Sequence, residues 1–311
     1  MATNTQTETE EKKIDLGAVW LSVRRFSKTF PSAAVAIAVL CFIAFLAFSA
    51  ELWTPFPRDK TISGRLLPLM DSAKGSYTWF GLAVPHYLGT DDIGRDFFTR
   101  MLHGGRVSIL VGLISPTIGI AFGAIMGIIG AYFGGATDLI IQRFTDTLMS
   151  IPSIVVSMAV TIALGFTLPV VILAIAIGIS PYASRLLRSH ALTLRGAQYI
   201  DAAQAIGASH WRIIFRHIVP NSWAPWIVML AVNVGNAIVL EASLSYLGIG
   251  IAPPTPSWGN LLSRANSFWH DNPHLVLVPG LTITIVVLCA NIFGDAIRDK
   301  LDPRLRGVGA S

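Results

Sequence analysis

Long apolar stretches separated by shorter polar segments dominate the pattern of hydrophobic and polar positions along this chain. Each stretch has about the 20 mostly apolar residues that a helix needs to cross a bilayer. The stretches are too long and too uniformly apolar for barrel strands, and a helix satisfies its own backbone hydrogen bonds in lipid. The pattern therefore predicts an all-α integral membrane protein with six transmembrane helices, at 32–50, 107–133, 147–165, 168–187, 223–247 and 275–297.

The composition agrees with a membrane protein, since 53% of the 311 residues are hydrophobic and only 13% are charged. The net charge of +5 does not call for nucleic acid, because the basic residues lie at span ends and in loops, where lipid headgroups account for them. Cys41 and Cys289 lie inside separate apolar stretches, which favours packing roles over a disulfide or a metal site. We expect the chain to contact the lipid bilayer and to bind no nucleic acid, metal or cofactor.

The first apolar stretch follows a polar leader, residues 1–31. The length of that leader and of the stretch fits a retained transmembrane anchor at 32–50 better than a cleaved signal peptide. Within the leader, apolar residues recur at helical spacing over 16–28 beside several basic residues. This spacing predicts an amphipathic helix on the inner membrane surface.

Basic residues are distributed unevenly between the two sides that six spans define. The loop 188–222 with the adjoining Arg185 carries five arginines, and the tail 298–311 carries four basic residues, whereas the loop 248–274 carries Arg264 alone. The excess of basic residues marks the cytoplasmic side, so both termini are predicted to be cytoplasmic in a bacterial inner membrane. Residues 51–106, rich in prolines, are then an external loop and the lead-in to the second helix.

Three glycines lie at four-residue spacing in the second predicted span: Gly119, Gly123 and Gly127. This spacing places them on one face of a helix, where a neighbouring backbone can approach closely. We therefore expect a tightly packed helix–helix interface within the predicted core, residues 107–297.

The segment 195–222 is too long for a connector and too polar to span a membrane, and it predicts a helical hairpin. Ser209 is a plausible N-cap for the second helix of that hairpin. Arg212 and Arg216 lie one turn apart, off the apolar stripe of this helix, and give it a basic face. The apolar stripe of this helix consists of Trp211, Ile214, Phe215 and Ile218. From this pattern, binding to the membrane surface and docking of a partner protein both remain open.

The stretch DAAQAIGASHWRIIFRHIVP at 201–220 resembles the EAA loop of permease subunits in binding-protein-dependent ABC importers. Three mild departures are Asp201 where Glu is usual, His217 where many subfamilies have Ile, and Val219 where Leu is usual. Further segments resemble the C-type subunit of the oligopeptide and dipeptide branch, which also contains nickel carriers. They are LGTDDIGRD at 88–96, EASLSYLGIGIAPPTPSWGN at 241–260 and GDAIRDKLDPR at 294–304.

This resemblance implies the MetI-like fold of type I importers and a translocation path shared with a homologous second permease. It also implies two ATP-binding subunits, which use ATP and Mg, and an external substrate-binding protein. No GxxxxGK[ST] segment occurs in this chain, which excludes the usual P-loop route to ATP hydrolysis, so we expect a non-catalytic subunit. The ATPase-coupling residues that the resemblance implies are Asp201, Ala202, Ala203, Gly207, Trp211, Arg212, Phe215, Arg216 and Pro220.

Glu241 is an ionisable residue at or near membrane depth, which makes it a candidate for the pathway or for gating. A structural hydrogen-bonding role for Glu241 remains open as well. In the loop 248–274, Trp258 follows a proline-rich turn, and either anchoring at the membrane interface or docking of the binding protein fits that pattern.

The leading function is thus an ATP-driven importer permease for dipeptides or oligopeptides, with nickel or another small solute as the alternative cargo. A stand-alone secondary transporter predicts an internal repeat, which the sequence lacks, and leaves the hairpin unexplained. An intramembrane enzyme needs a nucleophile facing a base, and Ser180 is followed by Pro181 instead of the glycine of an intramembrane serine protease.

Overall fold

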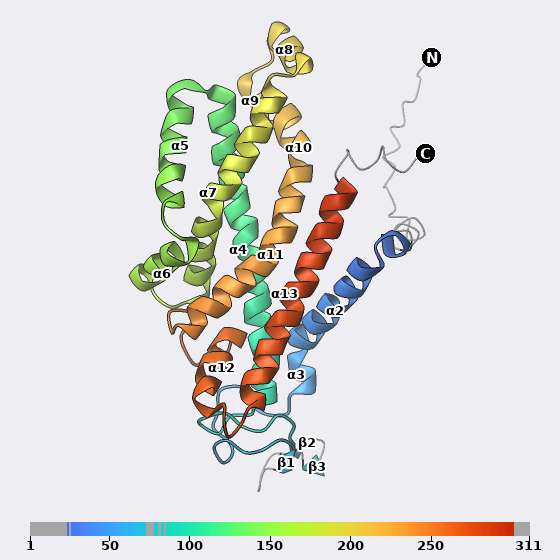
Figure 1. The fold of residues 1–311 in the computed structure, drawn as a ribbon, viewed down its shortest axis with the longest axis vertical. Coiled ribbons are helices and arrows are strands. Elements are labelled where there is room, and N and C mark those ends of the chain that lie inside the picture. The colour runs from blue at the N-terminus through green and yellow to red at the C-terminus, as the bar shows by residue number, and fades with distance from the viewer. Residues whose placement is uncertain (1–23, 25, 73–77, 80–81, 84, 302–311) are drawn as a thin grey trace, which may run out of the picture.

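The computed structural model describes residues 24, 26–72, 78–79, 82–83 and 85–301, which form an elongated helical bundle (Figure 1). The predicted surface helix over 16–28 lies almost entirely outside these residues, and the tail 298–311 lies mostly outside them. The helices are α2 (Pro31–Phe48), α3 (Ala50–Trp53), α4 (Phe97–Phe133), α5 (Gly135–Met149), α6 (Ser153–Leu164), α7 (Leu168–Arg195), α8 (Gln198–Ala205), α9 (His210–Ile213), the π-helical turn η1 (Ile214–Ile218), α10 (Val219–Asn221), α11 (Trp223–Tyr246), α12 (Trp258–Ala265), the 3-10 turn η2 (Asn266–Phe268) and α13 (His274–Leu301).

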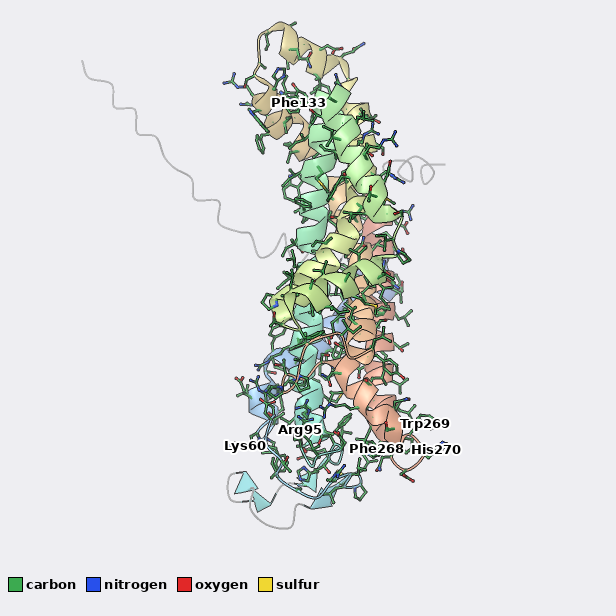
Figure 2. All side chains as sticks on the ribbon, turned by 90° about the vertical axis from the view of Figure 1, so that its left-hand side faces the viewer. Lys60, Arg95, Phe133, Phe268, Trp269 and His270 are labelled. Atoms are coloured by element: carbon green, nitrogen blue, oxygen red, sulfur yellow. The ribbon has the colours of Figure 1, made fainter. Side chains whose placement is uncertain are left out.

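The two ends of the bundle differ in what they carry. Helices α8 and α9 project from one end, here called the hairpin end (Figure 1). Helix α12 and two short antiparallel strand pairs lie at the other end, here called the cap end. Figure 2 places Phe133 toward the hairpin end and Lys60, Arg95 and Trp269 at the cap end. The strand pairs are β1 (Asp71–Ser72) with β4 (Pro85–His86) and β2 (Thr78–Trp79) with β3 (Leu82–Ala83).

Five helices are long and apolar enough to cross a membrane: α2, α4, α7, α11 and α13. The third predicted span, 147–165, differs in form from the prediction. Helices α5 and α6 are bent by 90° at the break between them, so this crossing is at most a broken span. The 12 residues of α6 rise only about 18 Å, against a hydrocarbon core about 30 Å thick.

The break between α5 and α6 follows from the residue Pro152. A proline pushes the preceding residue, Ile151, out of helical conformation, and Pro152 itself is extended with ψ 134°. The segment 134–146, predicted as a loop, is instead the larger part of α5. Hydropathy identified the apolar residues of this region correctly but not the turn that interrupts them.

The glycine interface predicted in the second span is confirmed. Helix α4 packs along α7, and a Cβ atom added at Gly119 or Gly123 would lie 2.5 Å from the carbonyl oxygen of Ala176 or Ser180. Gly127 meets the carbonyl of Ser184 in the same way. The three carbonyls are also four residues apart, so the two backbones touch at successive turns along one face of each helix.

Helix α4 begins ten residues earlier than the predicted start at 107. The Asp96 side chain accepts a hydrogen bond from the Thr99 backbone N–H at 2.7 Å and caps the helix. Asp91, five residues before, accepts hydrogen bonds from the backbone N–H groups of Ile93 and Arg95. The sequence LGTDDIGRD therefore folds as a tight turn that starts α4, so the last ten residues of the predicted segment 51–106 belong to this helix.

Buried ion pairs hold this turn in place at the cap end. The Asp91 carboxylate lies 2.7 Å from Arg95 Nε and 3.6 Å from Arg100 Nε, and all three side chains are buried. His86 Nδ1 lies 2.7 Å from Asp96 Oδ1, so β4 is joined to the start of α4. These contacts join β4, the turn before α4 and the first turns of α4 at the cap end.

Helix α2 packs on α4 and α13 and ends at Arg106 of α4. The Arg106 guanidinium donates to the carbonyl oxygens of Ala47 and Phe48, at 2.7 and 2.9 Å, and satisfies two groups that the helix end leaves open. It also donates to the Glu51 carboxylate at 2.9 Å, which lowers the pKa of Glu51 below its usual value. The first predicted helix, 32–50, thus matches α2 within two residues.

Candidate functional site

The predicted helical hairpin is present at 198–221. Helix α8 ends at Ala205, and Ser209 caps α9 by accepting a hydrogen bond from the Arg212 backbone N–H at 3.4 Å. Gly207 lies in the turn with φ +81°, a conformation that L side chains rarely adopt. The hairpin, its cap and its glycine turn are therefore confirmed as structural features.

The backbone conformation of the turn explains why a glycine occupies it. A Cβ at Gly207 would meet no atom within 4 Å, so the turn requires the positive φ and not a close backbone approach. Of the neighbouring candidates, Ala203 is buried, whereas Asp201 and Ala202 are exposed. The apex residue Ile206 is 85% exposed, which makes it the most exposed large apolar side chain of the hairpin.

The predicted apolar stripe of the second hairpin helix is only half right. Ile214 and Ile218 are buried, but Trp211 and Phe215 are 55% and 66% exposed. Ile213, absent from the prediction, is fully buried. The cause is the π-helical turn η1, which places residues five apart on one face, so that Ile213 aligns with Ile218.

The buried isoleucines join the hairpin to the bundle. Ile213, Ile214 and Ile218 form a hydrophobic cluster with Ile128 of α4 and Ala191 of α7. Because this cluster combines residues of the hairpin and of two long helices, the hairpin is packed against them and does not hang from a flexible connector.

Polar contacts that no sequence pattern indicated reinforce this attachment. The Arg195 guanidinium donates to the Ala131 carbonyl oxygen at 3.0 Å, and the Tyr132 hydroxyl lies 2.9 Å from His210 Nδ1. Arg188 holds the Asp138 carboxylate through two nitrogens at 2.6 and 2.5 Å. Since these bonds join α4, α5, α7 and α9, the hairpin end forms one connected unit.

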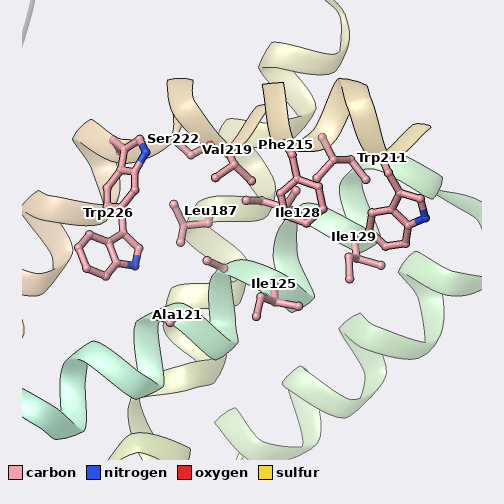
Figure 3. A pocket seen from close by; sticks show the side chains of 13 residues that line it. Ala121, Ile125, Ile128, Ile129, Leu187, Trp211, Phe215, Val219, Ser222 and Trp226 are labelled. Atoms are coloured by element: carbon pink, nitrogen blue, oxygen red, sulfur yellow. The ribbon is translucent and has the colours of Figure 1, made fainter. Parts of the chain in front are cut away.

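The exposed rings of Trp211 and Phe215 border an apolar groove of about 480 Å³ (Figure 3). The two rings stack with centroids 5.9 Å apart, and Ile125 and Ile129 of α4 lie across the groove from them. Arg212 and Arg216 are exposed, as predicted for a basic face, and Pro220 is exposed within α10. The hairpin therefore presents apolar and basic side chains together at its surface.

Glu241 lies on α11 toward the cap end and is fully buried. Its Oε2 accepts a hydrogen bond from the Ser108 hydroxyl and its Oε1 accepts one from the Ser245 hydroxyl, both at 2.8 Å. Ser108 in turn accepts from the Trp258 backbone N–H at 3.3 Å, and Ser257 donates to Ser245 at 3.3 Å. In this conformation the Glu241 carboxylate joins α4, α11 and the start of α12 and reaches no open surface.

Trp258 does not anchor the chain at the membrane interface. The ring is 2% exposed, and its Nε1 donates to the Met101 carbonyl oxygen at 3.1 Å. Trp258 follows the N-cap residue Ser257 and is the first residue of α12, where its ring is buried at the cap end. The buried ring is therefore not an anchor in the membrane interface, and docking of a binding protein at the loop 248–274 stays a prediction.

Residues 119–307 match the family described as "Binding-protein-dependent transport system inner membrane component". The chain belongs to this family. The matched part contains the glycine interface, the hairpin, Glu241 and α13, while Ser108, α2 and the strand pairs lie outside it.

Relatives of this permease carry transport names. The chain is 37% identical to the glutathione transport system permease protein GsiD of Pectobacterium atrosepticum, over 91% of this chain and 90% of the relative. It is 42% identical to the dipeptide transport system permease protein DppC of Alkalihalophilus pseudofirmus, over 73% and 74%. A probable D,D-dipeptide transport system permease protein, DdpC of Escherichia coli, is 36% identical over 88% and 87%.

A solved structure supports the predicted fold class. A chain of the MetNI methionine ABC transporter, from a structure titled as inward-facing, superposes with a TM-score of 0.51 over 65% of this permease and 96% of that chain. At 16% identity this likeness concerns the fold alone. The all-α, MetI-like ABC importer permease fold is thus confirmed, and the protein is an inner-membrane transport permease of the ABC importer class.

Proposed function

We propose that this permease imports dipeptides or oligopeptides as one half of an ATP-driven, binding-protein-dependent transporter. The family match makes it a membrane component of such a system, and the relatives described above are named for glutathione, dipeptide and D,D-dipeptide transport. All three names denote short peptides, so a peptide is favoured over nickel as the cargo. The partners are a homologous second permease, two ATP-binding subunits that use ATP and Mg, and an external substrate-binding protein.

The coupling role rests on the difference between the exposed outer side of the hairpin and its buried inner side. On its outer side it exposes Ile206, Trp211 and Arg212, a mixture of apolar and basic contacts suited to a protein surface. On its inner side, buried Ile213 and Ile218 fix it to the ends of α4 and α7. A displacement imposed on the outer side by an ATPase is therefore passed directly to the membrane helices.

This role sets the orientation of the chain. The hairpin end faces the cytoplasm, where the ATPase binds, and the cap end faces the binding protein. Residue Pro31 of α2 and residue Leu301 of α13 are the ends of those helices that point toward the hairpin end (Figure 1), in agreement with cytoplasmic termini. The basic residues of the segment 188–222 support the same orientation.

Reconstitution tests the function as a whole. The chain, its second permease and the two ATPase subunits are placed in vesicles with the binding protein, and uptake of a radiolabelled dipeptide is measured with and without ATP. Uptake that depends on ATP and on the ATPase is expected, and Ni²⁺ in place of the dipeptide should not be taken up. Dipeptide uptake by the chain without any ATPase would refute the proposal.

A pair of matched variants tests the docking surface. Ile206→Asp puts a carboxylate on the exposed apex of the hairpin, and Trp269→Asp makes the same change at an exposed ring of the cap end, 44% exposed. Copurification of the ATPase with the permease should be lost in the first variant and retained in the second. Equal retention of the ATPase in both variants would show that the hairpin is not its docking surface.

A further inference from the structure

Two hollows on one side of the bundle join into a single trough between α7 and α11. One has a volume of about 600 Å³ and the other about 650 Å³, and both are lined by Tyr182, Val232 and Asn233. The trough runs from Arg298 and His190 near the hairpin end to Val239 and Leu240, deeper in the bundle.

The polar residues of the trough lie at membrane depth. Asn233 and Asn236 are 10 and 13 residues from the start of α11, which corresponds to about 15 and 20 Å along a helix. With a hydrocarbon core about 30 Å thick, both amides lie near its middle. A polar side chain at this depth faces a functional surface more often than it faces lipid.

The hydrogen bonds of these side chains are incomplete within the described residues. Asn233 Nδ2 donates to the Met229 carbonyl oxygen at 2.8 Å, but its Oδ1 has no partner there. The Asn236 amide, which is exposed, and the Tyr182 hydroxyl, whose residue is 55% exposed, have no partner there either. An amide or hydroxyl left unpaired in hydrocarbon costs several kcal/mol, so water or protein must cover this face.

Two exposed threonines on other helices differ from the polar side chains of the trough. The Thr117 hydroxyl of α4 donates to the Leu113 carbonyl at 2.6 Å, and the Thr284 hydroxyl of α13 donates to the Gly280 carbonyl at 2.8 Å. Each is satisfied by its own helix and can face lipid at little cost. An exposed amide without a partner within the described residues also occurs at Asn291 of α13, but the trough brings three incompletely bonded polar side chains together in one hollow.

The chemistry of the trough fits a peptide backbone. Among its lining residues the only side chain with a permanent charge is Arg298, at the hairpin end, and the middle offers the neutral amides and the phenol. A side-chain amide is both a donor and an acceptor, as each peptide group is. Contacts of this kind hold any peptide sequence, and they are weak enough to release it.

We propose that the trough is this chain's share of the peptide path, and that Asn233, Asn236 and Tyr182 contact the backbone groups of the passing peptide. The inference rests on the proposed function for the identity of the cargo. Specificity for peptide over other solutes then lies partly in these uncharged groups, while amino-acid side chains of any charge pass.

Accessibility to a water-soluble thiol reagent tests the position of the trough in the assembled transporter. In a chain with Cys41→Ala and Cys289→Ala, Asn236→Cys is compared with Leu288→Cys of α13, a site 56% exposed on an apolar stretch. A membrane-impermeant methanethiosulfonate should modify the first thiol and not the second, and dipeptide delivered by the binding protein should slow that modification. Equal rates at the two sites would overturn the inference.

Transport by amide variants tests the contact itself. Asn236→Leu keeps the size and removes the amide, and loss of its hydrogen bond to peptide should lower dipeptide uptake by about tenfold. ATP hydrolysis stimulated by the binding protein should persist because the hairpin is unchanged. Asn236→Gln should recover part of the uptake, and Thr284→Val, the control on α13, should lose none.

The outcomes separate this inference from the proposed function. Full dipeptide uptake by Asn236→Leu would overturn the contact while leaving the importer intact. Absence of dipeptide uptake by the unaltered transporter would instead overturn the proposed function.

Discussion

Replacing Gly207 with valine is the sharpest perturbation of the coupling hairpin. The residue has φ +81°, and a Cβ there would meet no neighbour, so the substitution acts through backbone strain alone. A residue with a side chain in this left-handed region costs about 1–2 kcal/mol, and a β-branched residue lies at the upper end. This energy lowers the population of the native turn relative to alternatives by about 5- to 30-fold. The apparent affinity of the ATPase for the hairpin falls in proportion to the populated fraction of the native turn, so this factor is the upper bound of the expected loss.

The assay is titration of purified permease complex in detergent with labelled ATPase, together with ATP-dependent dipeptide uptake in vesicles. Gly207→Asn should bind nearly normally, because asparagine tolerates the left-handed conformation. Gly248→Val is the matched control, since Gly248 has φ +78°, also has open space around it, and lies at the end of α11 away from the hairpin. It should lower thermal stability and spare ATPase affinity. Unchanged affinity in Gly207→Val would refute the reasoning, as would equal losses in both valine variants.

Three more predictions follow from buried contacts. Glu241→Leu removes the acceptor of two buried serine hydroxyl groups and should destabilise the permease by about 2–6 kcal/mol in thermal unfolding, whereas Glu241→Gln, which keeps one of the two acceptor oxygens, should cost less. Gly123→Leu places a side chain against the Ser180 backbone and should abolish accumulation of folded permease in the membrane, measured by detergent-resistant monodisperse elution. Arg100→Met removes a buried partner of Asp91 and should destabilise the cap by about 3–5 kcal/mol, measured as faster proteolysis within 51–96.

Much of the fold was predictable because it depends on properties that repeat along the chain. The apolar stretches gave α2, α4, α7, α11 and α13, and glycine spacing gave the contact between α4 and α7. The third span was predicted wrongly in form because mean hydropathy averages over Pro152, whose effect is local. The early start of α4 was missed because Asp96, its cap, lies in a polar segment that a search for apolar residues passes over.

The site was less predictable because its contacts join distant parts of the chain. Ser209 and Gly207 follow local rules for caps and turns, and both were found. Ile213 was missed because a π-helical turn changes the period of the helix, although its five-residue spacing from Ile218 was a readable signal. The partner of Glu241 at Ser108 is 133 residues away, and no periodic pattern indicates such a contact.

The two ends of α11 are held in different ways, and this bears on how a push at the hairpin reaches the peptide path. At the hairpin end, α10 leads directly into α11 through Ser222, so the helix moves with the hairpin. Toward the cap end, Glu241 ties α11 to Ser108 of α4 within a fully buried cluster. Asn233 and Asn236 lie between the two attachments. If an ATPase drives the hairpin as proposed, we expect α11 to pivot near Glu241 and the wall of the trough to move most where it is closest to the hairpin.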